Sequence, residues 1–186
     1  MQHDIIFSGF GGQGALFAGQ LLAYAALGAG RNVTWIPSYG PEMRGGTAHC
    51  TVIVSDQAIG SPLVRHPSNV VALNNPSVEK YEPLLAPGGC LIYNASLVTR
   101  LIERGDIRAV AIPASDVAAE LGDRRLLNMV MLGALLDQTG VLPLAVVERA
   151  IEEHLPERHR GLLELNRQAL RRGRELAGSA LQFAGS

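Results

Sequence analysis

Three glycines, Gly9, Gly11 and Gly14, follow a short apolar segment and fit the pattern G-x-G-x-x-G. Residues 4–8 before them predict a buried strand, and residues 15–27 after them predict a helix with a broad apolar face. Glycines permit a tight turn, and the unpaired N–H groups that begin a helix point at an anion. The segment Gly9–Gly14 therefore predicts a phosphate-binding turn. The structural alternative is that these glycines only pack a strand closely against a helix.

A dinucleotide is the usual ligand of such a turn. Its ribose binds an acidic residue about 20 positions further on, at the end of the second strand. That strand is predicted at residues 33–36, and the residues that follow it, Pro37 to Gly40, include no acid. The first acid, Glu42, already lies within the next loop. The sequence favours a phosphate-bearing ligand other than a dinucleotide.

A second glycine-rich segment follows this strand. Two prolines and three glycines between residues 37 and 46 predict a loop. The loop should lie at the same sheet edge as the glycine turn, where α/β folds bind ligands. Its arginine beside two glycines suits a phosphate or a carboxylate, and its hydroxyl groups add donors. The alternative is a rigid surface loop whose arginine pairs with Glu42 or a neighbouring helix. The candidate binding residues of the two segments are Gly9, Gly11, Gly12, Gln13, Gly14, Ser38, Tyr39, Arg44, Gly45 and Gly46.

No complete catalytic or metal-binding set is recognisable. The five histidines are scattered, without the helical spacing of metal ligands. Cys50 follows His49, but neighbouring residues of a strand face opposite ways, which argues against a Cys–His pair. Asn74 and Asn75 end another predicted strand, where asparagine before Pro76 is more typical of a helix start than of a ligand site. The sequence indicates a chain that binds a ligand for chemistry performed elsewhere.

The elements that must position these residues alternate between strand and helix and then become helical. Further strands are predicted at 47–56, 69–73, 90–93 and 109–112. Further helices are predicted at 77–85, 115–121, 125–138, 144–154 and about 161–177. This order predicts an α/β protein, a three-layer α/β/α Rossmann-like domain with a mainly parallel sheet and C-terminal helices. We expect one domain over 1–186, with an α/β core at 1–113 and a helical part at 114–186. The apolar run Leu126–Leu136 should be buried in the domain or in a subunit interface.

Composition narrows the class of protein. The chain has 186 residues, is 47% hydrophobic and carries a formal net charge of -1, so it can bury a core and lacks the basic excess of a nucleic-acid-binding protein. No apolar run is long enough to span a membrane, and the first residues lack the basic start of a signal peptide. Its two cysteines, far apart, favour neither a disulfide framework nor a metal cluster. These features are typical of a reduced, cytoplasmic protein.

Three motifs together resemble a known family. Gly9-Phe-Gly-Gly-Gln-Gly14, Ser38-Tyr-Gly-Pro-Glu-Met-Arg-Gly-Gly46 and Asn128-Met-Val-Met-Leu-Gly133 occur in this order. The chain is similar over nearly its whole length to the gamma subunit of 2-oxoacid:ferredoxin oxidoreductases. The loop is most similar to the 2-oxoglutarate and branched-chain types, and the indolepyruvate enzyme is a close neighbour.

This resemblance implies a role within a complex. Such enzymes of anaerobic metabolism oxidatively decarboxylate a 2-oxoacid, join the acyl group to coenzyme A and reduce ferredoxin. Thiamine diphosphate, magnesium and iron–sulfur clusters would be held by partner subunits, and the gamma chain would bind coenzyme A and pack against the thiamine-binding subunits. By motif, the glycine turn and Gln13 would donate to the coenzyme A phosphates, and the candidate loop residues would face them. When isolated, the chain is expected to self-associate, for example as a homodimer.

Two other functions remain open from the sequence. One is a stand-alone dinucleotide-dependent oxidoreductase, which would bind NAD(H), NADP(H) or FAD tightly. The other is a purely structural interface subunit, whose assembly would depend on Leu126–Leu136 and which would bind no ligand. Neither the 2-oxoacid nor the oligomeric state can be inferred from the sequence.

Overall fold

A computed structural model describes residues 1–38 and 47–183 of the chain. Their centre is a six-stranded sheet with the order β2-β3-β1-β4-β5-β6. The strands β1, β4, β5 and β6 are mutually parallel, and β3 pairs antiparallel with both β1 and β2. The predicted α/β fold with a mainly parallel sheet is confirmed, with β3 as the reversed strand. The strands are β1 (Gln2–Phe10), β2 (Asn32–Ser38), β3 (Thr47–Ser55), β4 (Asn69–Ala72), β5 (Cys90–Asn94) and β6 (Arg108–Ile112).

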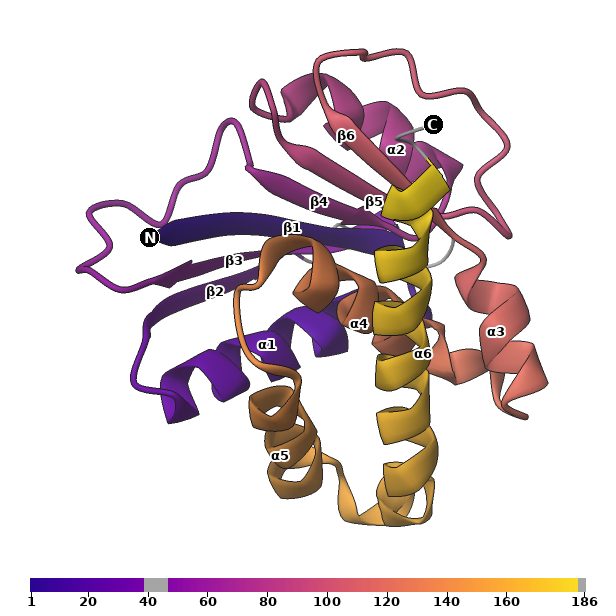
Figure 1. Cartoon of the computed structure of the whole chain (residues 1–186). Coiled ribbons are helices and arrows are strands. Elements are labelled where there is room, and N and C mark those ends of the chain that lie inside the picture. The colour runs from indigo at the N-terminus through magenta and orange to yellow at the C-terminus, as the bar shows by residue number, and fades with distance from the viewer. Residues whose placement is uncertain (39–46, 184–186) are drawn as a thin grey trace.

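The helices form two layers of unequal thickness. In Figure 1, α1, α4, α5 and α6 lie on one side of the sheet and α2 on the other. The helices are α1 (Ala15–Gly28), α2 (Asn75–Tyr81), α3 (Ala114–Glu120), α4 (Leu127–Thr139), α5 (Leu144–His154) and α6 (Leu163–Phe183). Short 3-10 turns are η1 (Glu82–Leu84), η2 (Arg124–Leu126) and η3 (Glu157–Leu162). The predicted three-layer architecture is therefore present, with a thinner second layer.

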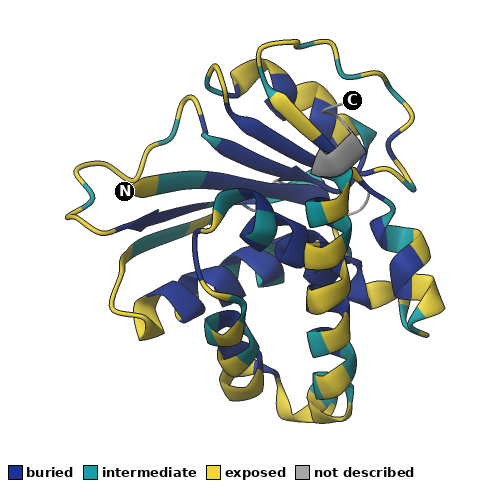
Figure 2. Ribbon diagram, in the orientation of Figure 1, coloured by how far each residue is buried: buried dark blue, intermediate teal, exposed yellow. Residues whose placement is uncertain are grey.

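Alternating side chains of β1 divide the core between these layers. Ile5 and Phe7 face the larger cluster, under α1 and α4, whereas Ile6 faces the smaller cluster around Val78 of α2. The central strands are buried along most of their length, and the helices turn their exposed residues outward (Figure 2). The run Leu126–Leu136 is buried inside the domain, between the sheet and α6, in agreement with the first of its two predicted locations.

Strand β3 departs from the expected βαβ unit because it lies between β1 and β2. Its register places His49 opposite both Ser8 of β1 and Ser38 of β2. A parallel crossover needs a dozen or more residues, and the segment from Ser38 to Thr47 is shorter than that. The chain therefore returns antiparallel after β2.

Several predicted boundaries are wrong by two or more residues. Strand β1 continues to Phe10 and so includes Gly9, and α4 begins at Leu127 rather than at residue 125. The loop predicted from Pro37 begins later, because Pro37 and Ser38 continue β2. Proline is tolerated there because β2 is an edge strand, where a missing N–H donor costs little. The helix predicted from Ser77 begins at Asn75, and Asn74 caps it by accepting a hydrogen bond from Ser77 N–H at 2.9 Å.

Helices α4 and α6 approach each other backbone to backbone. A Cβ atom on Gly133 would overlap the carbonyl oxygen of Leu170, and one on Gly173 would overlap that of Val130. Glycine at these two positions lets α6 lie directly on α4 and cover the larger cluster.

Candidate functional site

The glycine turn joins the carboxyl end of β1 to the start of α1. Gly12 has a φ of 89° and Gly14 a φ of 79°, the left-handed conformation that favours glycine. Gln13 N–H donates to the Phe10 carbonyl oxygen at 3.1 Å and closes the turn. Gly11 and Gly12 are exposed, and a Cβ atom on Gly12 would have no described neighbour within 4 Å. The turn is therefore open on its outer side rather than filled by side chains of the described residues.

The first turn of α1 has neither a capping side chain nor an acidic residue. The first N–H groups of an α-helix have no acceptor within the helix, and the helix dipole makes this end electropositive. The start of α1 thus has the electrostatic character of an anion-binding site.

Gln13 fixes the turn through its side-chain oxygen. Oε1 of Gln13 accepts from Phe10 N–H at 2.7 Å and from Asn74 Nδ2 at 3.1 Å. The second bond crosses from the end of β1 to the end of β4, at the point where helices leave the sheet on opposite faces. Ligands of open α/β sheets bind at such a point. The side-chain nitrogen of Gln13, Nε2, is the donor that these bonds leave for a ligand.

Asn128 supports the other end of the turn, a contact that the sequence analysis missed. Its Nδ2 donates to the Gly14 carbonyl oxygen at 3.2 Å, and its side chain fills the space into which a Cβ of Gly14 would point. Asn128 is the one residue with a polar side chain in the otherwise apolar run at 126–136. A polar residue in such a run is the signal that could have identified it, because buried amides are usually hydrogen-bonded.

Ser38 ends β2 at the same sheet edge as the glycine turn. Since His49 lies between Ser38 and Ser8 in the pairing, Ser38 is two strands from β1, about 10 Å. The other candidate loop residues lie outside the described residues. These are Tyr39, Arg44, Gly45 and Gly46.

Cys50 and His49 face opposite sides of the sheet, as their adjacency predicts. Cys50 is fully buried beneath α1, where burial raises the pKa of its thiol to about 12. His49 lies on the other face, with its ring 5.6 Å from that of Tyr81, and burial lowers its pKa. The two side chains cannot act as a nucleophile–base pair. Within residues 1–38 and 47–183, no cluster of three or more His, Cys, Asp or Glu residues is arranged to hold a metal ion.

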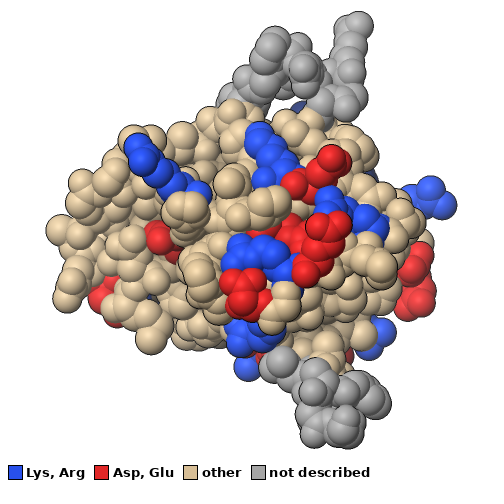
Figure 3. Space-filling view, turned by 90° about the horizontal axis from the view of Figure 1, so that it is seen from above, with Lys and Arg blue, Asp and Glu red and all other residues tan. Residues whose placement is uncertain are grey.

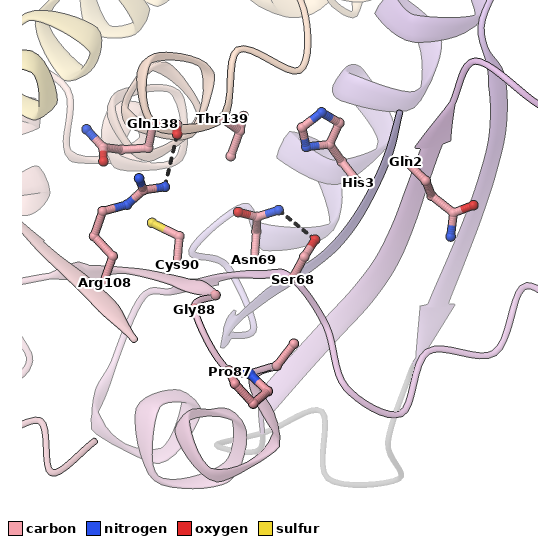
Figure 4. Close-up of a pocket in the computed structure, with 12 residues that line it drawn as sticks. Gln2, His3, Ser68, Asn69, Pro87, Gly88, Cys90, Arg108, Gln138 and Thr139 are labelled. Atoms are coloured by element: carbon pink, nitrogen blue, oxygen red, sulfur yellow. Dashed lines mark hydrogen bonds between the residues drawn. The ribbon is translucent and has the colours of Figure 1, made fainter. Parts of the chain in front are cut away.

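A cavity of about 290 Å³ lies at the other end of the strands from the glycine turn, next to the amino ends of β4, β5 and β6 (Figure 4). Nη2 of Arg108 donates to the Gln138 carbonyl oxygen at 3.1 Å on one side of it, and Asn69 Nδ2 donates to Ser68 Oγ at 2.9 Å on another. These bonds lie within the protein, and the cavity is separated from the glycine turn by the length of the strands.

Charges of both signs lie side by side on the face of the molecule seen from above (Figure 3). Ion pairs of the segment after β5 include Arg104 with Asp106 at 2.5 Å and Arg100 with the buried Glu82 at 3.4 Å. None of the described helices has the length and apolar character needed to cross a lipid bilayer.

A family model described as pyruvate ferredoxin/flavodoxin oxidoreductase matches residues 4–176. The chain belongs to this family. It is 37% identical over 183 residues to the 2-oxoglutarate synthase subunit KorC of Methanothermobacter marburgensis, covering 95% of this chain and 97% of KorC. It is 43% identical over 129 residues to the ketoisovalerate oxidoreductase subunit VorA of Methanothermobacter thermautotrophicus, covering 69% of this chain. The chain spans about a quarter of VorA, 27% of its length.

Solved structures of the family have the same fold. The gamma subunit of a keto/oxoacid ferredoxin oxidoreductase from Geobacter sulfurreducens superposes with a TM-score of 0.83 at 34% identity, over 96% of this chain and 99% of that one. The 2-oxoglutarate:ferredoxin oxidoreductase from Magnetococcus marinus, solved with 2-oxoglutarate, coenzyme A and succinyl-CoA bound, superposes with a TM-score of 0.86 at 24% identity, over 96% of this chain and 31% of that one. The resemblance to gamma subunits of 2-oxoacid:ferredoxin oxidoreductases is confirmed.

Proposed function

We propose that this chain is the coenzyme A-binding gamma subunit of a complex that oxidatively decarboxylates a 2-oxoacid to an acyl-CoA and reduces ferredoxin. Its membership of the family supports the class of complex. The observation that carries the ligand assignment is the uncapped start of α1 behind an open glycine turn. A coenzyme A-bound structure of the same fold makes coenzyme A the ligand to test first.

In this proposal, the decarboxylation and electron transfer take place in partner subunits. They would hold thiamine diphosphate with magnesium, which would supply the decarboxylation chemistry, and iron–sulfur clusters, which would supply electron transfer to ferredoxin. The gamma chain binds coenzyme A and packs against the thiamine-binding subunits. Its own residues bind and orient a substrate and transfer no proton.

The binding step uses backbone donors. The N–H groups of Gly12, Gly14, Ala15 and Leu16 receive the diphosphate of coenzyme A, and Nε2 of Gln13 adds a side-chain donor. The bonds of Gln13 and Asn128 hold these donors in place before the ligand arrives, which reduces the entropy lost on binding. Ser38 and the loop residues Tyr39, Arg44, Gly45 and Gly46 complete the site from the side of β2.

The proposed site is tested by a substitution that introduces a negatively charged carboxylate into the glycine turn. Gly12→Asp is expected to weaken coenzyme A binding at least about tenfold, because its charge occupies the position proposed for the phosphates. Gly30→Asp is the matched control. Gly30 lies just beyond the far end of the same helix, also has a positive φ (74°), and a Cβ there has no described neighbour within 4 Å. Titration calorimetry of the full chain with coenzyme A measures both variants. Equal affinities of wild type and Gly12→Asp would refute the site.

A dinucleotide is the competing ligand class. The same calorimetric titration with NADH, NADPH and FAD is expected to show affinities at least about tenfold below that for coenzyme A, because β2 ends at Ser38 without a carboxylate for the ribose. Tighter binding of any of the three would favour the stand-alone oxidoreductase instead. Assembly with partner subunits in the absence of any ligand binding would favour the purely structural interface subunit.

A further inference from the structure

A second cavity, of about 240 Å³, adjoins the start of α1 on the side away from the sheet. Its apolar wall comes from α1, from η2 before α4, from the segment between α5 and η3, and from the end of η3. The apolar side chains of this wall are Phe17, Leu126, Leu155 and Leu162, with Pro156, and the polar lining is Asp123, Arg125, Asn128, Arg158, His159 and Asn166. Pockets for a whole drug-sized ligand are usually larger, about 300–1,000 Å³. This cavity therefore suits one ring system of a longer molecule.

Asn128 connects the cavity to the glycine turn. It lines the cavity and also donates its Nδ2 to the carbonyl oxygen of Gly14. Phe17 follows Gly14 by three residues, about 4.5 Å along the helix axis. A group joined to a phosphate at the turn by a single sugar can therefore reach the cavity.

The cations of the cavity differ in their partners. Arg125 is paired with Asp123 at 2.6 Å. Among the described residues Arg158 has no carboxylate partner, and its Nε donates to Nε2 of His159 at 3.2 Å. The two terminal nitrogens of Arg158 are thus available for a bidentate contact, the geometry in which guanidinium binds phosphate.

We propose that this cavity binds the adenosine 3′-phosphate end of coenzyme A, an inference that rests on the proposed function. The base lies against Phe17 and the leucines, and Arg158 binds the 3′-phosphate. The pantetheine arm has no charge for Arg158 to bind, and its thiol must leave this chain to meet the acyl group. It therefore runs from the glycine turn in the other direction, toward the partner subunits.

The test compares two ligands that differ only in this phosphate. The full chain is titrated with coenzyme A and with 3′-dephospho-coenzyme A. Wild type is expected to bind coenzyme A at least about tenfold more tightly, the effect of one charge-assisted hydrogen bond. Arg158→Gln is expected to bind both ligands equally, at the wild-type affinity for dephospho-coenzyme A. Arg160→Gln, an exposed position of the same η3 turn that does not line the cavity, is the control and should retain the preference.

The outcomes separate this inference from the proposed function. If Arg158→Gln keeps the wild-type preference, or if wild type shows none, the subsite is wrong, while a loss of binding in Gly12→Asp still supports the turn. If wild type binds neither ligand, both proposals are wrong. Phe17→Leu gives a second measurement, because it keeps an apolar side chain but removes the ring. It should weaken coenzyme A binding several-fold and leave the preference for the 3′-phosphate intact; unchanged affinity would remove the base from this wall.

Discussion

At the scale of single residues, the buried Cys50 thiol is expected to make the free energy of unfolding depend on pH. Burial raises its pKa from 9.0 to about 12. Between these values the unfolded chain has lost a proton that the native protein keeps, so the free energy of unfolding falls as the pH rises, by at most about 1.4 kcal/mol per pH unit for this group. The contribution is complete below pH 9.

Urea unfolding at pH 7, 9 and 10 measures this dependence. Cys50→Ala is expected to be less stable at neutral pH, because a buried group is lost, but to show a shallower decline above pH 9. Some decline should remain, since burial also raises the pKa values of Cys90 and Tyr81. An identical slope in wild type and Cys50→Ala would contradict the assignment to Cys50.

Asn128 supports the candidate site without being in the turn itself. Asn128→Asp replaces a donor to the Gly14 carbonyl oxygen by a group that repels it, and we expect a loss of about 1–3 kcal/mol in unfolding free energy. Coenzyme A affinity should fall as well, because the start of α1 loses its support. Denaturation and calorimetry on the same sample measure both effects, and a variant with wild-type stability would show that the bond contributes little.

At the scale of elements, the close contact between α4 and α6 predicts that stability depends on glycine at its centre. Gly173→Ala should lower the unfolding free energy by about 3 kcal/mol, because its methyl group would overlap the backbone of Val130. Gly178→Ala, on the same helix, is the control. Its Cβ would lie 3.5 Å from the Asp137 carboxylate, an ordinary contact, and alanine favours the helix by about 1 kcal/mol. Equal effects of the two substitutions in chemical denaturation would contradict the close approach of the helices.

Sequence patterns predicted elements well where a local cause is sufficient. The strand, turn and helix around Gly9–Gly14 follow from apolar runs interrupted by glycines, and α5 begins and ends at the predicted residues. The position of β3 between β1 and β2 depends on pairing between distant segments. The bond from Asn128 to Gly14 joins residues 114 positions apart. Neither periodicity nor composition contains such contacts. The sequence therefore predicted the strand, turn and helix themselves, but not the distant segments that pack against the turn.

At the scale of the whole molecule, we expect the α/β core and the C-terminal helices to unfold as one cooperative unit. The larger core cluster contains Val110 and Ile112 of β6 together with Leu170 and Ala177 of α6. A fragment of residues 1–113 would expose this face of the sheet to water. We expect it to show no cooperative thermal transition by circular dichroism, in contrast to the full chain; a cooperative transition in the fragment would indicate two separable domains instead.

Self-association of the isolated chain is a further prediction at this scale. If the chain packs against partner subunits as proposed, the isolated chain exposes that surface, and large apolar side chains such as Leu101 and Leu63 are 85% and 79% exposed. Light scattering is expected to give a mass above 19.8 kDa. A monomeric mass at high concentration would contradict this prediction.

Both cysteines of the chain are enclosed by the core, with 0% and 1% of Cys50 and Cys90 exposed. A thiol held protonated in such a place reacts slowly with maleimides. A single cysteine engineered on the surface would therefore take up a fluorophore or a spin label selectively, with no need to replace the native pair first. Energy transfer or dipolar spectroscopy from such a probe could then test whether and how this chain approaches the partner subunits proposed for it.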